Sequence, residues 1–165
     1  MKADKLYLVG FMGAGKTTVA RALGRRLGWQ VEDVDERIEA RERRTVASIF
    51  AQQGEPYFRQ IERQVLHDLV PLRHAIVATG GGTFVDPENR ATMLADGAVV
   101  WLDVPLTRVI DRVPADGRRP LAADRARMEG LFDLRQVAYA QAHVRIDASA
   151  PVPEVVERIL DWIEY

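Results

Sequence analysis

The fold of this chain is decided by Gly10-Phe11-Met12-Gly13-Ala14-Gly15-Lys16-Thr17, which fits the pattern Gly-x-x-x-x-Gly-Lys-[Ser/Thr]. The apolar residues Leu6 to Val9 precede it and read as a strand, and a helical pattern from Thr18 to Leu27 follows. A glycine-rich turn between a strand and a helix is typical of a loop that binds the phosphates of a nucleoside triphosphate. The alternative is an ordinary turn with a surface lysine, which the flanking strand and helix disfavour.

The residue types of this loop suit phosphate binding. Glycines allow successive backbone N–H groups to turn inward, which makes a concave anion site at the start of a helix. Lys16 is expected to reach the β- and γ-phosphates of the nucleotide. The Thr17 hydroxyl is expected to take one position in the coordination shell of a magnesium ion.

Length and composition indicate a single domain without nucleic-acid or membrane partners. The chain has 165 residues and no cysteine, so one hydrophobic core suffices and disulfides are excluded. Lys and Arg total 23 and Asp and Glu 24, and the net charge of −1 creates no global field that attracts nucleic acid or an anionic membrane. Met1 to Asp4 lead into a strand rather than a signal peptide, and no apolar run approaches roughly 20 residues, so we expect a cytoplasmic protein.

Short apolar runs alternate with longer helical patterns along the chain, which predicts an α/β fold with a parallel sheet covered on both faces. The second and fifth runs are short and polar enough for edge strands, whereas the third and fourth read as buried central strands. The expected strands are Leu6 to Val9, Trp29 to Glu32, Ala75 to Thr79, Ala98 to Leu102 and Val144 to Ile146.

Helix boundaries are marked by capping residues and prolines. Asp86-Pro87 opens a helix that stops near Gly97, and Pro105 and Pro153 open two more.

Two segments depart from the alternation of strand and helix. A helical stretch from Ile38 to Val70 is broken at Gly54-Glu55-Pro56 and carries no strand signal, so it looks like an insertion beside the sheet. The segment from Arg112 to Asp124 has the proline, glycine and arginine content of a mobile surface loop.

Two carboxylates follow the second expected strand, at the edge of the sheet where ligands bind in this class of fold. Asp33 is a candidate to hold magnesium through water. Asp35 is a candidate to accept a hydrogen bond from a substrate hydroxyl and to orient or deprotonate it for attack on the γ-phosphate. The alternative for Asp35 is that it only caps a helix that starts at Glu36.

Two further candidate features lie after the third expected strand and in the helical insertion. Gly80-Gly81-Gly82 suggests close approach of a ligand to bare backbone, although a tight turn is the alternative. Arg59 has apolar neighbours and is placed to aim its guanidinium inward at a carboxylate, but a solvated arginine is common in such a position.

Three arginines, Arg112, Arg118 and Arg119, lie within eight positions of the expected surface loop. Arginines on a closing lid are a recurrent way to stabilise the charge that develops in phosphoryl transfer. The alternative is a charged flexible loop.

Taken together, the motifs resemble the shikimate kinase family over nearly the whole chain, from Leu6 to about Asp147. The shared features, in order, are the phosphate loop, Asp33-Val34-Asp35, Phe58-Arg59, Gly80-Gly81-Gly82, Arg112 with Arg119-Pro120-Leu121, and Arg135 with Tyr139.

The resemblance implies the role of each matching residue. Asp35 would bind the ring hydroxyls of shikimate and position the 3-hydroxyl, while Arg59 and Arg135 would grip its carboxylate. Asp33 would support the magnesium ion through water, beside Thr17. ATP would be bound by Gly13, Ala14, Gly15, Lys16, Thr17 and Thr18, and by Arg112 and Arg119 from a lid at about 112–124, with Gly81 and Gly82 completing the acceptor site. Either Arg118 or Arg119 could be the residue that reaches the phosphates, and the following Pro120-Leu121 favours Arg119.

The resemblance also implies a five-stranded parallel sheet in the order 2-3-1-4-5 and an acceptor-binding segment at about 35–63. The expected activity is ATP-dependent phosphorylation of shikimate by a monomer that uses Mg²⁺, with Lys16, Asp35 and Arg119 as catalytic residues. A gluconate kinase of the same architecture and a nucleotide-binding module that transfers nothing are the alternatives.

Overall fold

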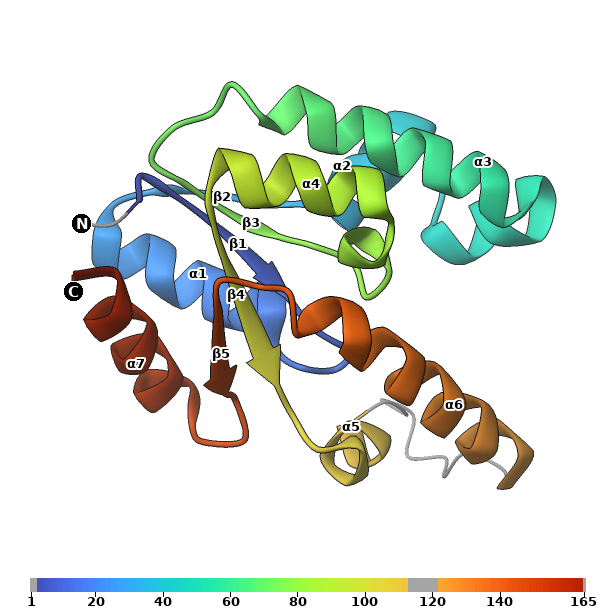
Figure 1. Ribbon diagram of the computed structural model, residues 1–165. Coiled ribbons are helices and arrows are strands. Elements are labelled where there is room, and N and C mark those ends of the chain that lie inside the picture. The colour runs from blue at the N-terminus through green and yellow to red at the C-terminus, as the bar shows by residue number, and fades with distance from the viewer. Residues whose placement is uncertain (1–2, 113–121, 165) are drawn as a thin grey trace.

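Five parallel strands form the centre of the computed structural model, which describes residues 3–112 and 122–164 (Figure 1). The sheet order β2-β3-β1-β4-β5 confirms the expected topology, and β2 and β5 are the edge strands, as predicted. The strands are β1 (Lys5–Val9), β2 (Gln30–Asp33), β3 (Ala75–Ala78), β4 (Ala98–Asp103) and β5 (Val144–Asp147).

The three central strands are apolar along almost their whole length because helices cover both faces of the sheet. Every residue of β1 and β3 is buried, whereas Gln30 in β2 is exposed and the rest of that strand is half-buried. In the register of the sheet, Leu8 of β1 lies opposite Ala78 of β3 and Val100 of β4.

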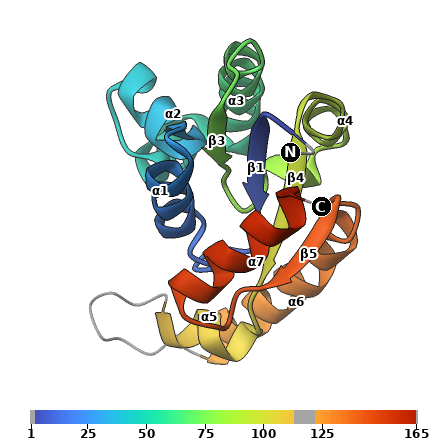
Figure 2. The same cartoon turned by 90° about the vertical axis from the view of Figure 1, so that its left-hand side faces the viewer.

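Helices α1 (Lys16–Leu27) and α7 (Val152–Glu164) cover one face of the sheet, and α4 (Pro87–Asp96) lies on the other face (Figure 2). The predicted helix starts at Asp86, Pro105 and Pro153 are confirmed within one or two residues, with α5 (Leu106–Arg112) following Pro105. Asp86 caps α4 by accepting a hydrogen bond from the Asn89 N–H at 3.3 Å.

The predicted insertion consists of α2 (Val34–Glu42) and α3 (Val46–Leu69), which pack side by side at the β2 side of the sheet (Figure 1). The predicted break is confirmed, because Gly54 has φ 83° and ψ 170° and interrupts α3. A second break, at Arg43 with φ 54°, was not predicted.

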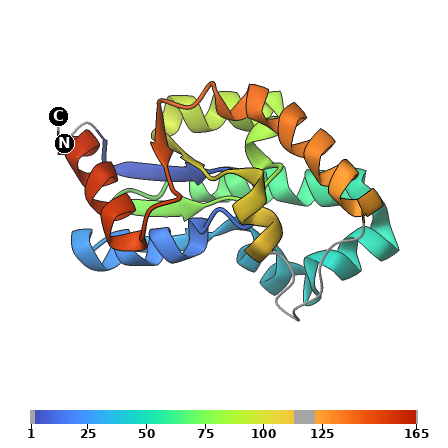
Figure 3. The same ribbon diagram turned by 90° about the horizontal axis from the view of Figure 1, so that it is seen from below.

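The carboxyl ends of the strands face α5, α6 (Ala122–Tyr139) and the first turns of α3, while both chain termini lie at the opposite end (Figure 3). Between Thr83 and Val85 a short 3₁₀ helix, η1, connects the end of β3 to α4. Most of the expected surface loop, including Arg118 and Arg119, lies outside the described residues. No helix within residues 3–112 and 122–164 has the length and apolar character needed to cross a membrane.

A buried ionic cluster joins β1 to the helices at the amino ends of the strands. The Lys5 side chain is fully buried, and its Nζ lies 2.7 Å from Asp96 Oδ2. The Tyr7 hydroxyl donates to the same oxygen at 2.6 Å. Lys5 also donates to the Val70 carbonyl at 3.2 Å, and Arg73 pairs with the other oxygen of Asp96. Because a buried charge is tolerated only when it is paired, Asp96 holds this end of the sheet together.

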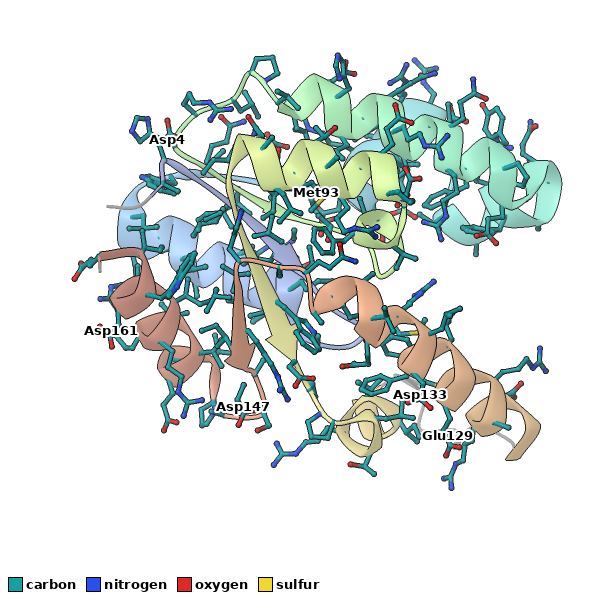
Figure 4. All side chains as sticks on the ribbon, viewed as in Figure 1. Asp4, Met93, Glu129, Asp133, Asp147 and Asp161 are labelled. Carbon is teal, nitrogen blue, oxygen red and sulfur yellow. The ribbon has the colours of Figure 1, made fainter. Side chains whose placement is uncertain are left out.

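We expect Asp96→Ala to lower the free energy of unfolding by about 3 kcal/mol, because Lys5 is then buried without its counter-ion. Urea denaturation measures this change. The matched control is Asp161→Ala on the outer face of α7, where the side chain is exposed (Figure 4) and the effect should stay within about 0.5 kcal/mol. Equal stability of the two variants would show that the cluster contributes nothing to folding.

Candidate active site

Two adjoining cavities lie at the carboxyl ends of the strands and share part of their walls. The first has a volume of about 440 Å³ and is lined by the phosphate loop from Met12 to Thr18, with Asp33 and Asp35. The second has a volume of about 230 Å³ and is lined by residues of α2, α3, α6 and the glycine turn. Both cavities contact Met12, Asp35, Gly80 and Gly81. A ligand in one cavity therefore lies next to a ligand in the other.

The phosphate loop has the conformation that its glycines predict. Gly13 and Gly15 have φ values of 76° and 89°, in the left-handed region that favours glycine, and Lys16 begins α1 directly afterwards. The Lys16 amine is buried and donates to the carbonyls of Gly10 and Phe11, the latter at 3.2 Å. Burial lowers the pKa of Lys16 to about 8.

Thr17 and Asp33 meet at the side of this loop. The Thr17 hydroxyl donates to Asp33 Oδ2 at 2.7 Å, while Asp33 Oδ1 accepts a hydrogen bond from the Glu36 N–H at 3.0 Å. Asp33 is therefore the N-cap of α2, because that helix begins at Val34. The alternative in which Asp35 caps a helix starting at Glu36 is wrong.

A hydroxyl and a carboxylate beside a phosphate loop also form a donor set that suits magnesium. Thr17 and Asp33 both line the first cavity, and both present oxygen atoms, which this hard cation prefers. The residues present therefore fit the expected ion.

Asp35 lies in the first turn of α2, and its side chain lines both cavities. Its Oδ1 atom is buried, and no residue of the described chain donates a hydrogen bond to it. The pKa of Asp35 is raised to about 6, mainly by burial and also by the carboxylates of Asp33 and Glu62, while Lys16 opposes the rise. A buried carboxyl without a partner and with a raised pKa is a feature of functional sites rather than of stable cores.

Arg59 is directed into the second cavity by a buried carboxylate that the sequence did not reveal. Its Nη1 donates to Glu62 Oε1 at 3.0 Å and to Oε2 at 3.2 Å, and its guanidinium lies 5.2 Å from the centre of the Phe58 ring. The guanidinium lines the second cavity, but the carboxylate that it meets in the structure is that of Glu62, so its contact with an acceptor carboxylate stays a prediction. Glu62 was missed, although an acid between Ile61 and Val65 on a buried helix face is a signal.

Arg135 approaches the same cavity from α6. Its guanidinium lies 5.8 Å from the centre of the Phe11 ring, and among the described residues no carboxylate lies within 4.0 Å of it. The guanidinium groups of Arg59 and Arg135 thus flank one end of the cavity, where a small acid would meet two cations.

The three consecutive glycines make room for these arginines. A Cβ atom on Gly81 would lie 2.8 Å from Arg135 Nη1, and one on Gly82 would lie 2.4 Å from Arg59 Nη2. The segment also forms a turn, in which the Thr83 N–H donates to the Gly80 carbonyl at 3.3 Å. The tight-turn interpretation of the glycine run is therefore confirmed, whereas the close approach of a ligand to its backbone stays a prediction. The Tyr139 hydroxyl donates to the Gly81 carbonyl and fixes the turn from α6.

The expected lid arginines are not brought to the site by the described residues. Arg112 is the last residue of α5, but its side chain, like all of Arg119, lies outside what the structure describes. Sequence reasoning also missed several apolar side chains of the second cavity. These are Met12, Val46 and Phe50, whose apolar character alone did not distinguish them from core residues.

The geometry agrees with comparisons to known proteins. The family model for shikimate kinase matches residues 12–164. The shikimate kinase of Persephonella marina is 40% identical over 160 residues, which cover 96% of this chain and 98% of that protein. The chain belongs to the shikimate kinase family.

Solved structures of the family have the same fold. The shikimate kinase of Aquifex aeolicus is 35% identical with a TM-score of 0.89, over 97% of this chain and 96% of that one. The Acinetobacter baumannii shikimate kinase in complex with shikimate is 34% identical with a TM-score of 0.91, over 98% and 93% of the two chains. The two alternatives, a gluconate kinase and a non-catalytic nucleotide-binding module, are not favoured.

The raised pKa of Asp35 predicts how the stability of the fold depends on pH. The Asp35 carboxyl ionises at about pH 4 in the unfolded chain and at about pH 6 in the folded protein, so the wild type loses stability as the pH rises through this window. Asp35→Asn cannot ionise and therefore does not lose this stability. We expect this variant to gain about 1 to 2 kcal/mol over the wild type at pH 8, allowing for partial solvent exposure, and little at pH 4.

Urea denaturation of both proteins at pH 4 and pH 8 measures the effect. The control is Asp161→Asn, an exposed position where the difference from the wild type should not change with pH. The same difference at both pH values for Asp35→Asn would contradict the assignment of the raised pKa.

Proposed function

We propose that this protein transfers the γ-phosphoryl group of ATP to the 3-hydroxyl of shikimate, giving shikimate 3-phosphate and ADP. The observation that carries the proposal is the position of Asp35, which lines both cavities and whose buried Oδ1 atom has no hydrogen-bond partner among the described residues. A carboxylate at this junction can contact the acceptor hydroxyl while the hydroxyl faces the γ-phosphate.

The first cavity would hold ATP. Backbone N–H groups at the start of α1 would surround the phosphates, and the Lys16 amine would leave its two carbonyl acceptors to contact the β- and γ-phosphates. We assign this role to Gly13, Ala14, Gly15, Lys16, Thr17 and Thr18. Arg112 and Arg119, from the proposed lid at about 112–124, would reach the phosphates from the open side.

Thr17 and Asp33 would hold a magnesium ion, Thr17 directly and Asp33 through water. Bound there, the ion would neutralise charge on the β- and γ-phosphate oxygens. The 2.7 Å hydrogen bond between the two side chains keeps both residues together in the lining of the first cavity.

The second cavity, formed mainly by the proposed acceptor segment at about 35–63, would hold shikimate. Arg59 and Arg135 would bind its carboxylate, and the N–H groups of Gly81 and Gly82 would face the ring from the turn. The ring hydroxyls would then lie at the opposite end, beside Asp35. One end of the cavity is cationic and the other anionic, which matches a small hydroxy acid in a single orientation.

In the reaction, the ionised Asp35 would accept the proton of the 3-hydroxyl as the oxygen attacks the γ-phosphorus. The new P–O bond replaces the bond to the β-phosphate oxygen, and ADP leaves. Lys16 and Arg119 would stabilise the charge on the transferred group.

We propose a monomer as the working unit. The net charge of −1 supports small-molecule substrates rather than nucleic acid or a membrane surface as partners. We place the protein in the cytoplasm, where its substrates would be found.

A coupled assay for ADP, with ATP, magnesium and shikimate, tests the function together with the role of Asp35. We expect shikimate-dependent ADP release by the wild type, and a fall in kcat of at least about 100-fold for Asp35→Asn with ATP affinity nearly unchanged. Product analysis should place the phosphate on the 3-oxygen.

Two results would contradict these assignments. No ADP release above the acceptor-free rate in the wild type would exclude the function. Full activity of Asp35→Asn would exclude Asp35 from the mechanism but leave the function standing.

For Arg59→Lys we expect a KM for shikimate at least about tenfold higher, because an ammonium cannot reproduce the two parallel hydrogen bonds of a guanidinium. The KM for ATP should change less than about twofold, since Arg59 does not line the first cavity. Arg158→Lys on α7 is the matched control. An unchanged KM for shikimate would remove Arg59 from the acceptor site.

A further inference from the structure

Thr83 follows the glycine turn directly and links two parts of the acceptor site through its side chain. The residue is fully buried at the start of η1. Its hydroxyl donates to Glu62 Oε2 at 2.9 Å and accepts a hydrogen bond from the Gly80 N–H at 3.0 Å. The hydroxyl thus connects α3, which carries Arg59, to the turn that separates the two cavities.

The direction of these hydrogen bonds is fixed by chemistry. A hydroxyl has one proton to donate, and a backbone N–H can only donate, so the bond with Gly80 uses the hydroxyl as acceptor. An ionised carboxylate accepts only, so the single proton of Thr83 goes to Glu62.

The backbone around Thr83 holds the hydroxyl in place. Its N–H donates to the Gly80 carbonyl at 3.3 Å, and its carbonyl accepts a hydrogen bond from the buried Asn89 side chain at 3.2 Å. Because both backbone groups of Thr83 are hydrogen-bonded, its Cα position is fixed and its hydroxyl stays within reach of Glu62.

On the α3 side, the hydroxyl completes the coordination of a buried carboxylate. Glu62 is fully buried, and its described hydrogen-bond partners are Arg59 and Thr83. A buried carboxylate keeps its position only when its oxygens are satisfied, so the loss of one donor allows it to move. Such a movement releases the Arg59 guanidinium from the direction in which Glu62 holds it.

On the turn side, the hydroxyl fixes the surface against which Asp35 packs. A Cβ atom on Gly80 would lie 3.0 Å from Asp35 Oδ1 and 3.3 Å from Oδ2, so this glycine is in close contact with the carboxyl. The Gly80 N–H donates to the Thr83 hydroxyl, whose oxygen would also lie 3.3 Å from that Cβ atom. One hydroxyl therefore relates the position of Asp35 to that of Arg59.

We propose that Thr83 is a positioning residue that fixes the separation between the arginine clamp for the acceptor carboxylate and the carboxyl group that receives the acceptor hydroxyl. This inference rests on the proposed function of the second cavity. Thr83 does not touch the substrate; it acts through Glu62 on Arg59, and through Gly80 on the placement of that clamp relative to Asp35.

The test is a double-mutant cycle between Thr83 and Arg59, with steady-state kinetics as the readout. Thr83→Val keeps the shape of the side chain and removes the hydroxyl. We expect it to raise the KM for shikimate about tenfold, with kcat within about threefold and the KM for ATP within about twofold of the wild type. Thr83→Ser retains the hydroxyl and should restore the KM to within about twofold.

The cycle separates positioning from general stability. If Thr83 acts through Arg59, then Thr83→Val in the Arg59→Lys background should raise the KM by less than about twofold, because the clamp is already lost. Thr92→Val on α4, whose hydroxyl bonds only to the Glu88 carbonyl among the described contacts, is the matched control and should have wild-type kinetics. Thr83→Ala replaces Thr83→Val if the latter does not fold.

Three outcomes would overturn the inference. The first is an unchanged KM for shikimate in Thr83→Val, and the second is a rise in the KM for ATP as large as that for shikimate. The third is a tenfold rise in the KM for shikimate that persists in the Arg59→Lys background. The proposed function fails separately, because it requires shikimate-dependent ADP release by the wild type whatever Thr83 does.

Discussion

The parallel pairing of β1 with β3 is the interaction on which the rest of the site depends. At the end of this pair, the Thr79 N–H and hydroxyl both donate to the Leu8 carbonyl, at 3.2 and 2.8 Å. The phosphate loop leaves β1 and the glycine turn leaves β3 immediately beyond this point, so the two backbones face each other. Because β2 pairs with the other side of β3, Asp33 and Asp35 arrive at the same edge. Three adjacent strand ends thus supply residues of the first cavity, of the second cavity and the Asp35 carboxyl that lines both.

Charged side chains are buried at both ends of the sheet, but they are satisfied to different degrees. At the amino ends, Asp96 is bonded to Lys5, Tyr7 and Arg73, which is the pattern of a structural ion cluster. At the carboxyl ends, Asp35 has a buried oxygen without a donor among the described residues. A buried carboxyl oxygen without a donor destabilises the fold and is typical of a site where a ligand supplies the missing donor. An acceptor hydroxyl is such a ligand.

Local chemistry made the strands, the phosphate loop and the cap of α4 predictable, because each depends on neighbouring residues. The strand order required the family resemblance, since pairing partners lie far apart in sequence. The alternative in which Asp35 caps a helix from Glu36 was wrong because α2 starts two residues earlier, with Asp33 as its N-cap, and periodicity does not resolve such a boundary. Glu62 and Thr83 were not recognised because their importance comes from a contact between α3 and η1, which only the folded chain brings together.

A crystal structure of the protein with ADP, magnesium and shikimate would show whether one acceptor spans the second cavity with Asp35 at its reacting end. We expect shikimate with its carboxylate between Arg59 and Arg135 and its 3-hydroxyl within hydrogen-bond distance of Asp35, pointing towards the β-phosphate of ADP. Shikimate bound outside this cavity, or bound with its carboxylate towards Asp35, would contradict it.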